Sequence, residues 1–343
     1  MDSYFILQNP GHNWVYYQES EKLALSELKL CCLKLDLPNA DPQAVEVCGV
    51  RYFRFFLNRP FDESISLEIG RLSFFFALFK SENDRFLPIA VNPKFPVEKS
   101  LSGVQKYIGK TNELFTRMMV NIGRMFLEKN SNIRLLDPVA GRGTTLFEGV
   151  HYGMKSYGIE IEKKSIEQAN LFIKKYLQGE RFKYSFSKNQ VSGSDKKNGV
   201  FMETFEFAKN KADFKDDSSR LQLSFVNGNT LACEQFFKRD FFDLIIGDLP
   251  YGVQHGNKKQ HSEKNFTRSP EELVTDGLLG WKKTLRKSGI VVLGWNVNLF
   301  SYKKMAALFE SQDFDVLGKE AYLDFQHQVD QAIKRNILVA RKL

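Results

Sequence analysis

The stretch IRLLDPVAGRGTTLFEG, residues 133–149, carries the clearest structural pattern in the chain. Its first part, IRLLDP, is a short apolar run that predicts a β-strand, and its last part, GTTLFEG, predicts a helix that continues through VHYG. Gly141 and Gly143 stand between the two. Glycines in a strand-to-helix turn let the backbone approach a ligand where any side chain would collide. We therefore expect a ligand to bind at this turn.

Predicted helices and short apolar strands alternate around this stretch, from Gln105 onward. Repeated strand-helix units predict a mostly parallel sheet with helices on both faces, and ligands of such sheets bind beyond the carboxyl ends of the strands. Further strands are predicted at 155–161, 221–229, 241–250 and 289–296, and helices at 112–129, 163–177, 231–239, 270–287 and 302–311.

Acidic residues end the first two predicted strands. Asp137 ends the first, and Glu160 follows 23 residues later, where an acid can accept both hydroxyls of a ribose. Leu146 stands in place of the third glycine of a dinucleotide fingerprint, which argues against NAD. The two acids suit S-adenosylmethionine, which has an amino-acid end and an unphosphorylated ribose. Taken singly, each feature also has a structural reading: a helix cap, a tight turn or a surface acid.

The stretch FFDLIIGDLPYG, residues 241–252, places an acid, a proline and an aromatic ring at the end of the predicted fourth strand. An exocyclic amino group is a poor nucleophile because its lone pair is delocalised into the ring. Asp248 can accept one of its N–H groups, and a carbonyl held outward by Pro250 can accept the other, which stabilises the charge that develops on nitrogen. Tyr251 can stack on a flipped base. This pattern indicates methylation of an exocyclic amine.

DPVAGRGTTLFEG, YGIEIE and DLIIGDLPYG together resemble the class I S-adenosylmethionine-dependent amino-methyltransferases. The likeness is strongest to the THUMP-associated tRNA (guanine-N2) methyltransferases, whose D-x-P-Y/F-G motif is a variant of (N/D)PPY. It covers about residues 109–343, beginning with GKTNELFTR, and implies a Rossmann-like class I methyltransferase fold. The resemblance implies that S-adenosylmethionine is held by Asp137, Pro138, Gly141, Gly143, Thr144, Glu160, Ile161 and Asn229, and the target amine by Asp248, Leu249, Pro250 and Tyr251.

Two positions depart from the family pattern. Leu249 replaces the first proline of the general motif, which favours the RNA guanine group over the DNA adenine enzymes. Asn229 stands where the family usually has Asp against the adenine amino group, and its side-chain oxygen can still accept that bond.

The first hundred residues predict a small α+β domain of order β-α-β-β, with SISLEIGRLSFFFALF (residues 64–79) taken as a strand. The segment 87–100, with three prolines, separates it from a methyltransferase domain at 101–343. The small domain is too short for a full THUMP arrangement and resembles at most its ferredoxin-like companion half.

Charge divides unequally between the two domains. Residues 1–100 hold 11 Lys and Arg against 13 Asp and Glu, whereas residues 101–343 hold 38 against 28, a balance of +10. A distributed positive surface suits a polyanion such as RNA, although general solubility explains it equally well.

Two polar segments can contact a nucleic acid. Residues 184–220 form a long insertion that we expect to be either a surface loop or a substrate-contacting flap. The segment after the catalytic motif can reach phosphates and a base through Lys258, Lys259, Lys264, Arg268 and Phe266.

The sequence shows no pattern of a metalloprotein, a disulfide-bonded protein or a membrane protein. Cys31, Cys32, Cys48 and Cys233 form no CxxC pair and the histidines, including His255 and His261, have no ligand spacing, so we expect reduced thiols and no metal. The longest apolar stretch is too short for a bilayer and the first thirty residues lack a signal pattern, which favours a cytoplasmic protein.

The function that the sequence predicts is methyl transfer to an exocyclic amino group of a base in RNA, with guanine N2 in tRNA as the expected target. Two alternatives stay open: a DNA adenine-N6 methyltransferase, and a non-catalytic nucleic-acid-binding protein on the same fold. The sequence leaves open which RNA and which nucleotide are modified, how many methyl groups are added and what the oligomeric state is.

Overall fold

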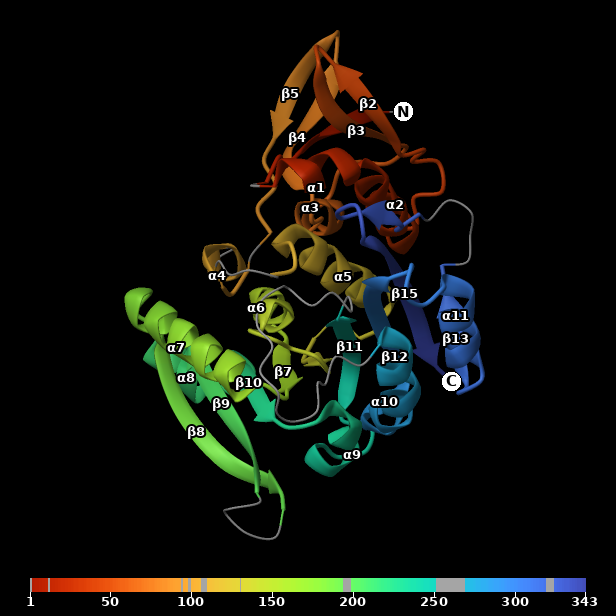
Figure 1. Cartoon of the computed structure of the whole chain (residues 1–343). Coiled ribbons are helices and arrows are strands. Elements are labelled where there is room, and N and C mark those ends of the chain that lie inside the picture. The colour runs from red at the N-terminus through yellow and green to blue at the C-terminus, as the bar shows by residue number, and fades with distance from the viewer. Residues whose placement is uncertain are drawn as a thin grey trace.

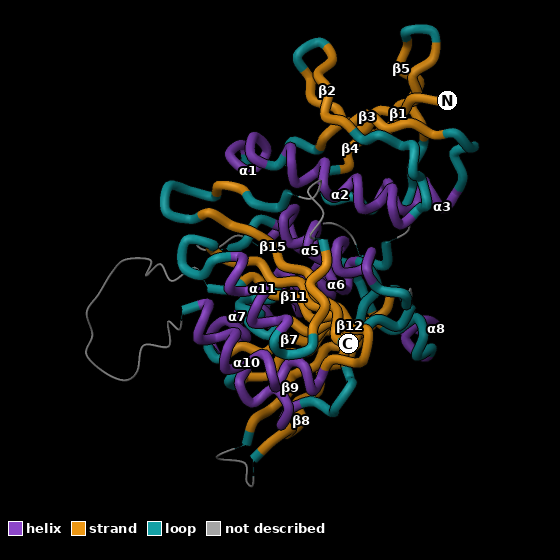
Figure 2. Tube along the Cα trace, turned by 90° about the vertical axis from the view of Figure 1, so that its right-hand side faces the viewer, coloured by secondary structure: helices purple, strands orange, loops and turns teal. Residues whose placement is uncertain are grey.

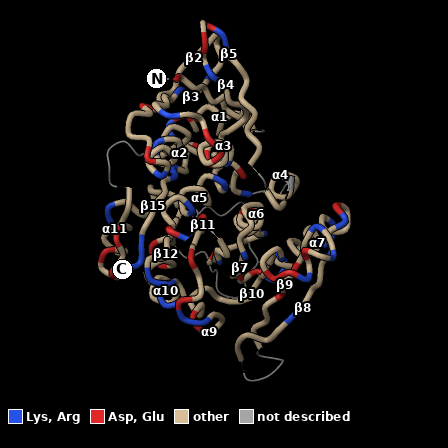
Figure 3. Tube along the Cα trace, turned by 180° about the vertical axis from the view of Figure 1, so that it is seen from behind, with Lys and Arg blue, Asp and Glu red and all other residues tan. Residues whose placement is uncertain are grey.

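The chain folds into two units, a small antiparallel sheet with helices and a larger α/β unit (Figure 1). The computed structural model describes residues 2–11, 13–93, 95–97, 100–105, 110–129, 131–193, 199–250, 269–318 and 324–343. No helix within these ranges is long and apolar enough to span a membrane. Lys and Arg residues are distributed over many elements, with acidic residues among them (Figure 3).

The first unit is an antiparallel sheet of order β2-β3-β1-β4-β5. Its helices lie between the sheet and the second unit, and the β2–β3 and β4–β5 turns point away from that unit (Figure 2). The elements are β1 (Asp2–Gln8), α1 (Trp14–Glu19), α2 (Glu21–Lys34), β2 (Gln43–Val47), β3 (Val50–Leu57), α3 (Glu63–Gly70), β4 (Phe75–Glu82) and β5 (Arg85–Ile89).

The predicted β-α-β-β order is therefore wrong in part, because α3 occupies half of the stretch expected to be one strand. Asp62 caps α3 by accepting the amide of Ile65 at 2.9 Å, and Ile65 and Ile69, four apart, bury the same helix face. The proline-rich connector begins within β5, where Pro88 lies on an edge strand and interrupts no central ladder.

The second unit has a doubly wound sheet. Its parallel strands run in the order β10-β7-β6-β11-β12, so the order reverses between β6 and β11, as in Rossmann folds. The strands are β6 (Arg134–Asp137), β7 (Lys155–Glu160), β8 (Lys183–Ser192), β9 (Val200–Ala208), β10 (Leu221–Asn227), β11 (Phe242–Asp248), β12 (Leu285–Asn296), β13 (Phe314–Leu317), β14 (His327–Gln328) and β15 (Lys334–Lys342).

Helices cover both faces of this sheet, which confirms the predicted α/β Rossmann-like class. Buried residues of α5, α6 and α7 pack on one face and those of α9, α10 and α11 on the other. The helices are α4 (Ser100–Val104), α5 (Glu113–Phe126), α6 (Thr144–His151), α7 (Lys163–Gly179), α8 (Lys211–Lys215), the 3₁₀ turn η1 (Thr230–Ala232), α9 (Cys233–Phe236), α10 (Pro270–Thr284) and α11 (Tyr302–Glu310).

The insertion at 184–220 is not a loop in its described part. β8 and β9 form an antiparallel hairpin that extends the sheet beyond β10, and α8 follows it. Most of β8 is exposed on both faces, so this strand lacks the apolar alternation of a half-buried strand in the sequence. The antiparallel strands at the other edge, β15 and β13, were also not predicted.

The two units share one hydrophobic core. Apolar residues of α2, β1 and β3 belong to the same buried cluster as those of α5, β11 and β12. Arg124 of α5 makes a two-bond ion pair with Glu68 of α3, at 3.0 and 2.6 Å, and Asn121 donates to Glu27 of α2 at 2.8 Å. Burial raises the pKa of Glu27. These contacts fix the first unit on α5.

Candidate functional site

The predicted glycine turn lies between β6 and α6 at the reversal point of the sheet. Gly141 and Gly143 have φ angles of 52° and 87°, in the left-handed region that favours glycine. A Cβ at Gly143 would lie 2.7 Å from the ring of Phe225, so this glycine is required by packing. A Cβ at Gly141 would meet nothing within 4 Å, which leaves open space beside the backbone.

Glu160 ties the end of β7 to this turn. One of its carboxylate oxygens accepts the amide of Gly141 at 2.8 Å, and the other accepts the amide of Glu162 at 2.7 Å. Burial raises the pKa of Glu160. Each carboxylate oxygen can accept a second hydrogen bond, so Glu160 can still receive two hydroxyls from a ligand.

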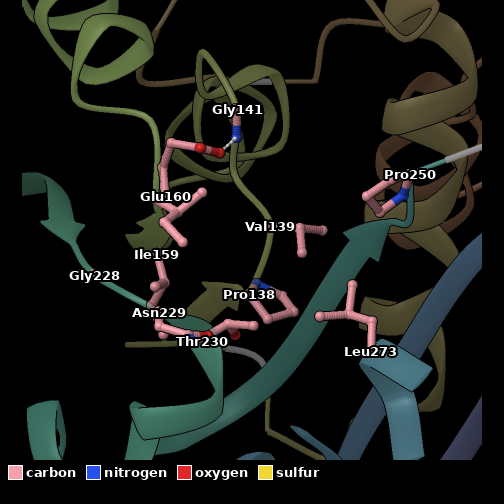
Figure 4. A pocket seen from close by; sticks show the side chains of 11 residues that line it. Pro138, Val139, Gly141, Ile159, Glu160, Gly228, Asn229, Thr230, Pro250 and Leu273 are labelled. Carbon is pink, nitrogen blue, oxygen red and sulfur yellow. Dashed lines mark hydrogen bonds between the residues drawn. The ribbon is translucent and has the colours of Figure 1, made fainter. Parts of the chain in front are cut away.

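A cavity of about 300 Å³ opens beside Glu160, a size within the usual range of small-molecule sites (Figure 4). Glu160 and Asn229 lie on one side of it and Pro250 and Leu273 on the other. Six residues named from the sequence line it: Pro138, Gly141, Glu160, Ile161, Asn229 and Pro250. Val139, Ile159, Gly228, Thr230 and Leu273 also line it and were not named.

Asn229 is held by its own local structure. Its side-chain oxygen caps the turn η1 by accepting the amide of Leu231 at 3.1 Å, and the neighbouring Thr230 accepts the indole N–H of Trp281 at 2.9 Å. The side-chain oxygen of Asn229 retains one acceptor position for a ligand amine.

A second, polar cavity of about 290 Å³ adjoins the first, because Val139 and Gly141 line both. Its walls include Thr111, Asp137, Thr144, Glu162 and Asp248. It therefore joins the glycine turn to the predicted catalytic acid.

Asp137 lies deep in this second cavity. It accepts the amide of Val139 at 2.9 Å and a hydrogen bond from Thr145. Burial raises the pKa of Asp137 to about 7, and the nearby carboxylates of Asp248 and Glu160 act in the same direction. A cationic ligand group placed here would favour the ionised carboxylate.

Asp248 stands at the end of β11, beside the glycine turn as predicted. One of its oxygens, Oδ2, accepts the hydroxyl of Thr111 at 2.6 Å and lies 3.5 Å from the guanidinium of Arg335. Sequence reasoning missed both partners. Thr111 precedes α5 within GKTNELFTR, the segment that begins the family resemblance, whereas nothing in the sequence around Arg335 indicated a site.

The leucine in the motif has a structural explanation. Leu249 is 1% exposed, and its amide donates to the carbonyl of Gly294 on β12 at 2.8 Å. Proline has no N–H and could not make this bond. Pro250 is exposed and lines the first cavity. Tyr251 lies outside the described residues, as do the two loop histidines and all five residues of the proposed basic contact segment.

Metal ligands are not grouped in the described part of the chain. Within the ranges given above, no three His, Cys, Asp or Glu side chains are placed to hold a metal ion. The four cysteines are free thiols, and Cys48 is the exposed one among them.

Comparisons with known proteins give similarity in fold alone. No family model and no curated protein matches the chain. Among solved structures, TehB from Haemophilus influenzae is 12% identical with a TM-score of 0.37, over 66% of this chain and 61% of TehB. This chain thus spans less than two thirds of the length of TehB.

Two further structures show likeness of the same order. The 1,6-didemethyltoxoflavin-N1-methyltransferase of Burkholderia thailandensis, with bound S-adenosylhomocysteine, is 14% identical with a TM-score of 0.39, over 67% of this chain and 79% of that one. The ribosomal protein L11 methylase of Lactobacillus delbrueckii subsp. bulgaricus is 12% identical with a TM-score of 0.37, over 67% and 80%. Similarity at this level transfers neither a substrate nor a residue role.

Proposed function

We propose that this chain is an S-adenosylmethionine-dependent methyltransferase that acts on an exocyclic amino group of a base in RNA, with guanine N2 in tRNA as the expected target. One observation carries the proposal: the glycine turn, Glu160 and Asp248 end three neighbouring parallel strands, β6, β7 and β11, and border two adjoining cavities.

The residues around the first cavity fit the adenosine part of the cofactor. Glu160 offers two acceptors to the ribose hydroxyls, and the apolar side chains of Val139, Ile161 and Leu273 suit the faces of a purine. Asn229 offers an acceptor to the adenine amino group. Asp137, in the second cavity, offers a carboxylate to the ammonium of the methionine part. When bound, S-adenosylmethionine supplies a methyl group on a positively charged sulfur.

Asp248 supplies the chemistry toward the target amine. Its carboxylate borders the second cavity and can accept an N–H from that amine, which draws the nitrogen toward tetrahedral geometry and stabilises its growing positive charge. The carbonyl beside Pro250 is the second acceptor of the proposal, and Tyr251 is the proposed stacking ring. The balance of +10 in residues 101–343 supports a polyanionic substrate.

Single-turnover methyl transfer to total RNA from cells that lack the gene tests this function. Guanine N2 should be methylated by the wild type, and Asp248→Ala should abolish turnover while S-adenosylhomocysteine still binds, because Asp248 is proposed to contact the target amine and not the cofactor. If, in the same assay with DNA as substrate, only adenine of DNA were methylated, the protein would be a DNA adenine-N6 methyltransferase. Failure of the wild type to bind S-adenosylhomocysteine would decide for the non-catalytic protein.

A further inference from the structure

Arg335 lies behind the catalytic end of β11, on the antiparallel strand β15. Its side chain is 4% exposed and lines neither cavity, so it is placed to touch Asp248 but not a substrate or cofactor. The guanidinium lies 3.5 Å from Oδ2 of Asp248 and 4.3 Å from the ring centre of Phe115 on α5. A buried guanidinium between a carboxylate and an aromatic face has little freedom to move.

Thr111 and Arg335 approach the same oxygen of Asp248 from different elements. The hydroxyl of Thr111 comes from the segment before α5, and the guanidinium comes from β15. A hydrogen bond and an ion pair on one oxygen restrict rotation of the carboxylate about its Cβ–Cγ bond. We propose that Arg335 is a positioning residue for methyl transfer, which fixes the plane of the Asp248 carboxylate at the border of the second cavity.

The first unit supports this arrangement from behind. His327 of β14 pairs with Arg335 in the sheet register, and its ring lies 5.2 Å from that of Phe115. On the other side, Tyr16 of α1 meets His327 edge to face at 6.3 Å. Burial lowers the pKa of His327 to about 4, so this ring is neutral near pH 7. Tyr16 of the N-terminal unit thus contacts β14, which pairs with β15, the strand that carries Arg335.

This inference rests on the proposed function, and it assigns the N-terminal unit a part in the chemistry. Without Arg335, Asp248 keeps its bond to Thr111 but gains rotational freedom. The loss should therefore fall on the rate of the chemical step rather than on ligand binding.

Kinetics of Arg335→Met on total RNA from cells that lack the gene tests the inference. We expect kcat to fall by about 10- to 100-fold, the range known for residues that orient metal-ligating side chains, with KM for S-adenosylmethionine within twofold of the wild type. Arg335→Lys should recover part of the rate. Arg341→Met, on the same strand but bonded to the carbonyl of Phe126, is the matched control and should keep the wild-type kcat. Tyr16→Leu should act in the same direction by a smaller factor.

A second variant covers the case in which Arg335→Met does not fold. A Cβ at Gly294 would lie 3.1 Å from the other oxygen of Asp248 and 3.3 Å from the ring of Phe115, so Gly294→Ala crowds both the carboxylate and the ring against which Arg335 lies. It should show the same loss in kcat. Wild-type kcat in Arg335→Met or Gly294→Ala, or a loss of S-adenosylhomocysteine binding that parallels the loss of rate, overturns the inference. Methyl transfer by the wild type and its loss in Asp248→Ala test the proposed function, independently of the result for Arg335.

Discussion

The hydroxyl of Thr111 donates to Oδ2 of Asp248 at 2.6 Å, although 137 residues separate the two in the chain. Thr111 is placed by the cap of α5, where Asn112 accepts the amides of Leu114 at 2.9 Å and Phe115 at 3.3 Å. The start of α5 therefore determines where the Asp248 carboxylate can lie.

Replacing Thr111 by Val should lower the rate of methyl transfer, because Val keeps the shape of Thr and removes the donor. A hydrogen bond to a charged group contributes about 1.5–3 kcal/mol, which corresponds to roughly 10- to 100-fold in kcat if the contact matters mainly in the transition state. Thr111→Ser keeps the hydroxyl and should stay within a few-fold of the wild type. Equal rates for Val and Ser would show that the bond has no role in positioning Asp248.

Replacing Glu160 by Ala should weaken S-adenosylhomocysteine binding by roughly 2–3 kcal/mol, measured by calorimetry. The variant loses both ribose acceptors and also the bond that holds the amide of Gly141. Glu180→Ala, at the exposed end of α7, is the control and should bind normally. Unchanged affinity in Glu160→Ala would remove this residue from the site.

Cofactor affinity should rise with pH between about 6 and 7. Burial raises the pKa of Asp137 to about 7, so the carboxyl is mostly protonated at pH 6, and a ligand ammonium binds the ionised form. The dissociation constant of S-adenosylhomocysteine should be roughly fivefold higher at pH 6 than at pH 7, the ratio of the ionised fractions. Calorimetry in two buffers of different ionisation enthalpy should show proton release on binding. Asp137→Asn should lose most of this pH dependence, and an unaltered slope would contradict the assignment.

Breaking the ion pair between the two units should strongly destabilise the whole chain. Arg124→Leu leaves Glu68 buried without its main partner, which typically costs about 3–5 kcal/mol in the free energy of unfolding. The double variant Glu68→Leu with Arg124→Leu should be closer to the wild type, because no carboxylate is left buried without a partner and only Arg71 loses its bond to Glu68. Urea unfolding followed by circular dichroism and by tryptophan fluorescence should give coincident transitions, since one core spans both units. Separate transitions would show that the units unfold independently.

The parts of the site that the sequence predicted are those in which one short segment supplies both the element and the functional group. The run 133–149 contains a strand, the left-handed glycines and a helix, and its turn is formed by neighbouring residues. Asp248 follows an apolar strand directly, and parallel pairing of β11 with β6 brings it beside that turn.

The parts that the sequence could not predict depend on contacts between distant segments. Nothing near Arg335 signals that β15 pairs with β12 and so brings this side chain behind Asp248. Leu273 lines a cavity because of how α10 packs, and an isolated leucine carries no such information. The strand β8 was missed because its exposed faces give no apolar period.

The position of β15 has a consequence for the order of events during synthesis. β15 lies between β12 and β13, so β12 leaves the ribosome with one edge unpaired and stays so until residues 334–342 follow. An unpaired edge of an apolar strand is prone to wrong pairing while it waits. Because β15 also carries Arg335, the pairing of this residue with Asp248 forms only after the parallel strands have been synthesised. Slow translation of residues 297–333 should therefore lower the yield of active protein more than slow translation of the first hundred residues.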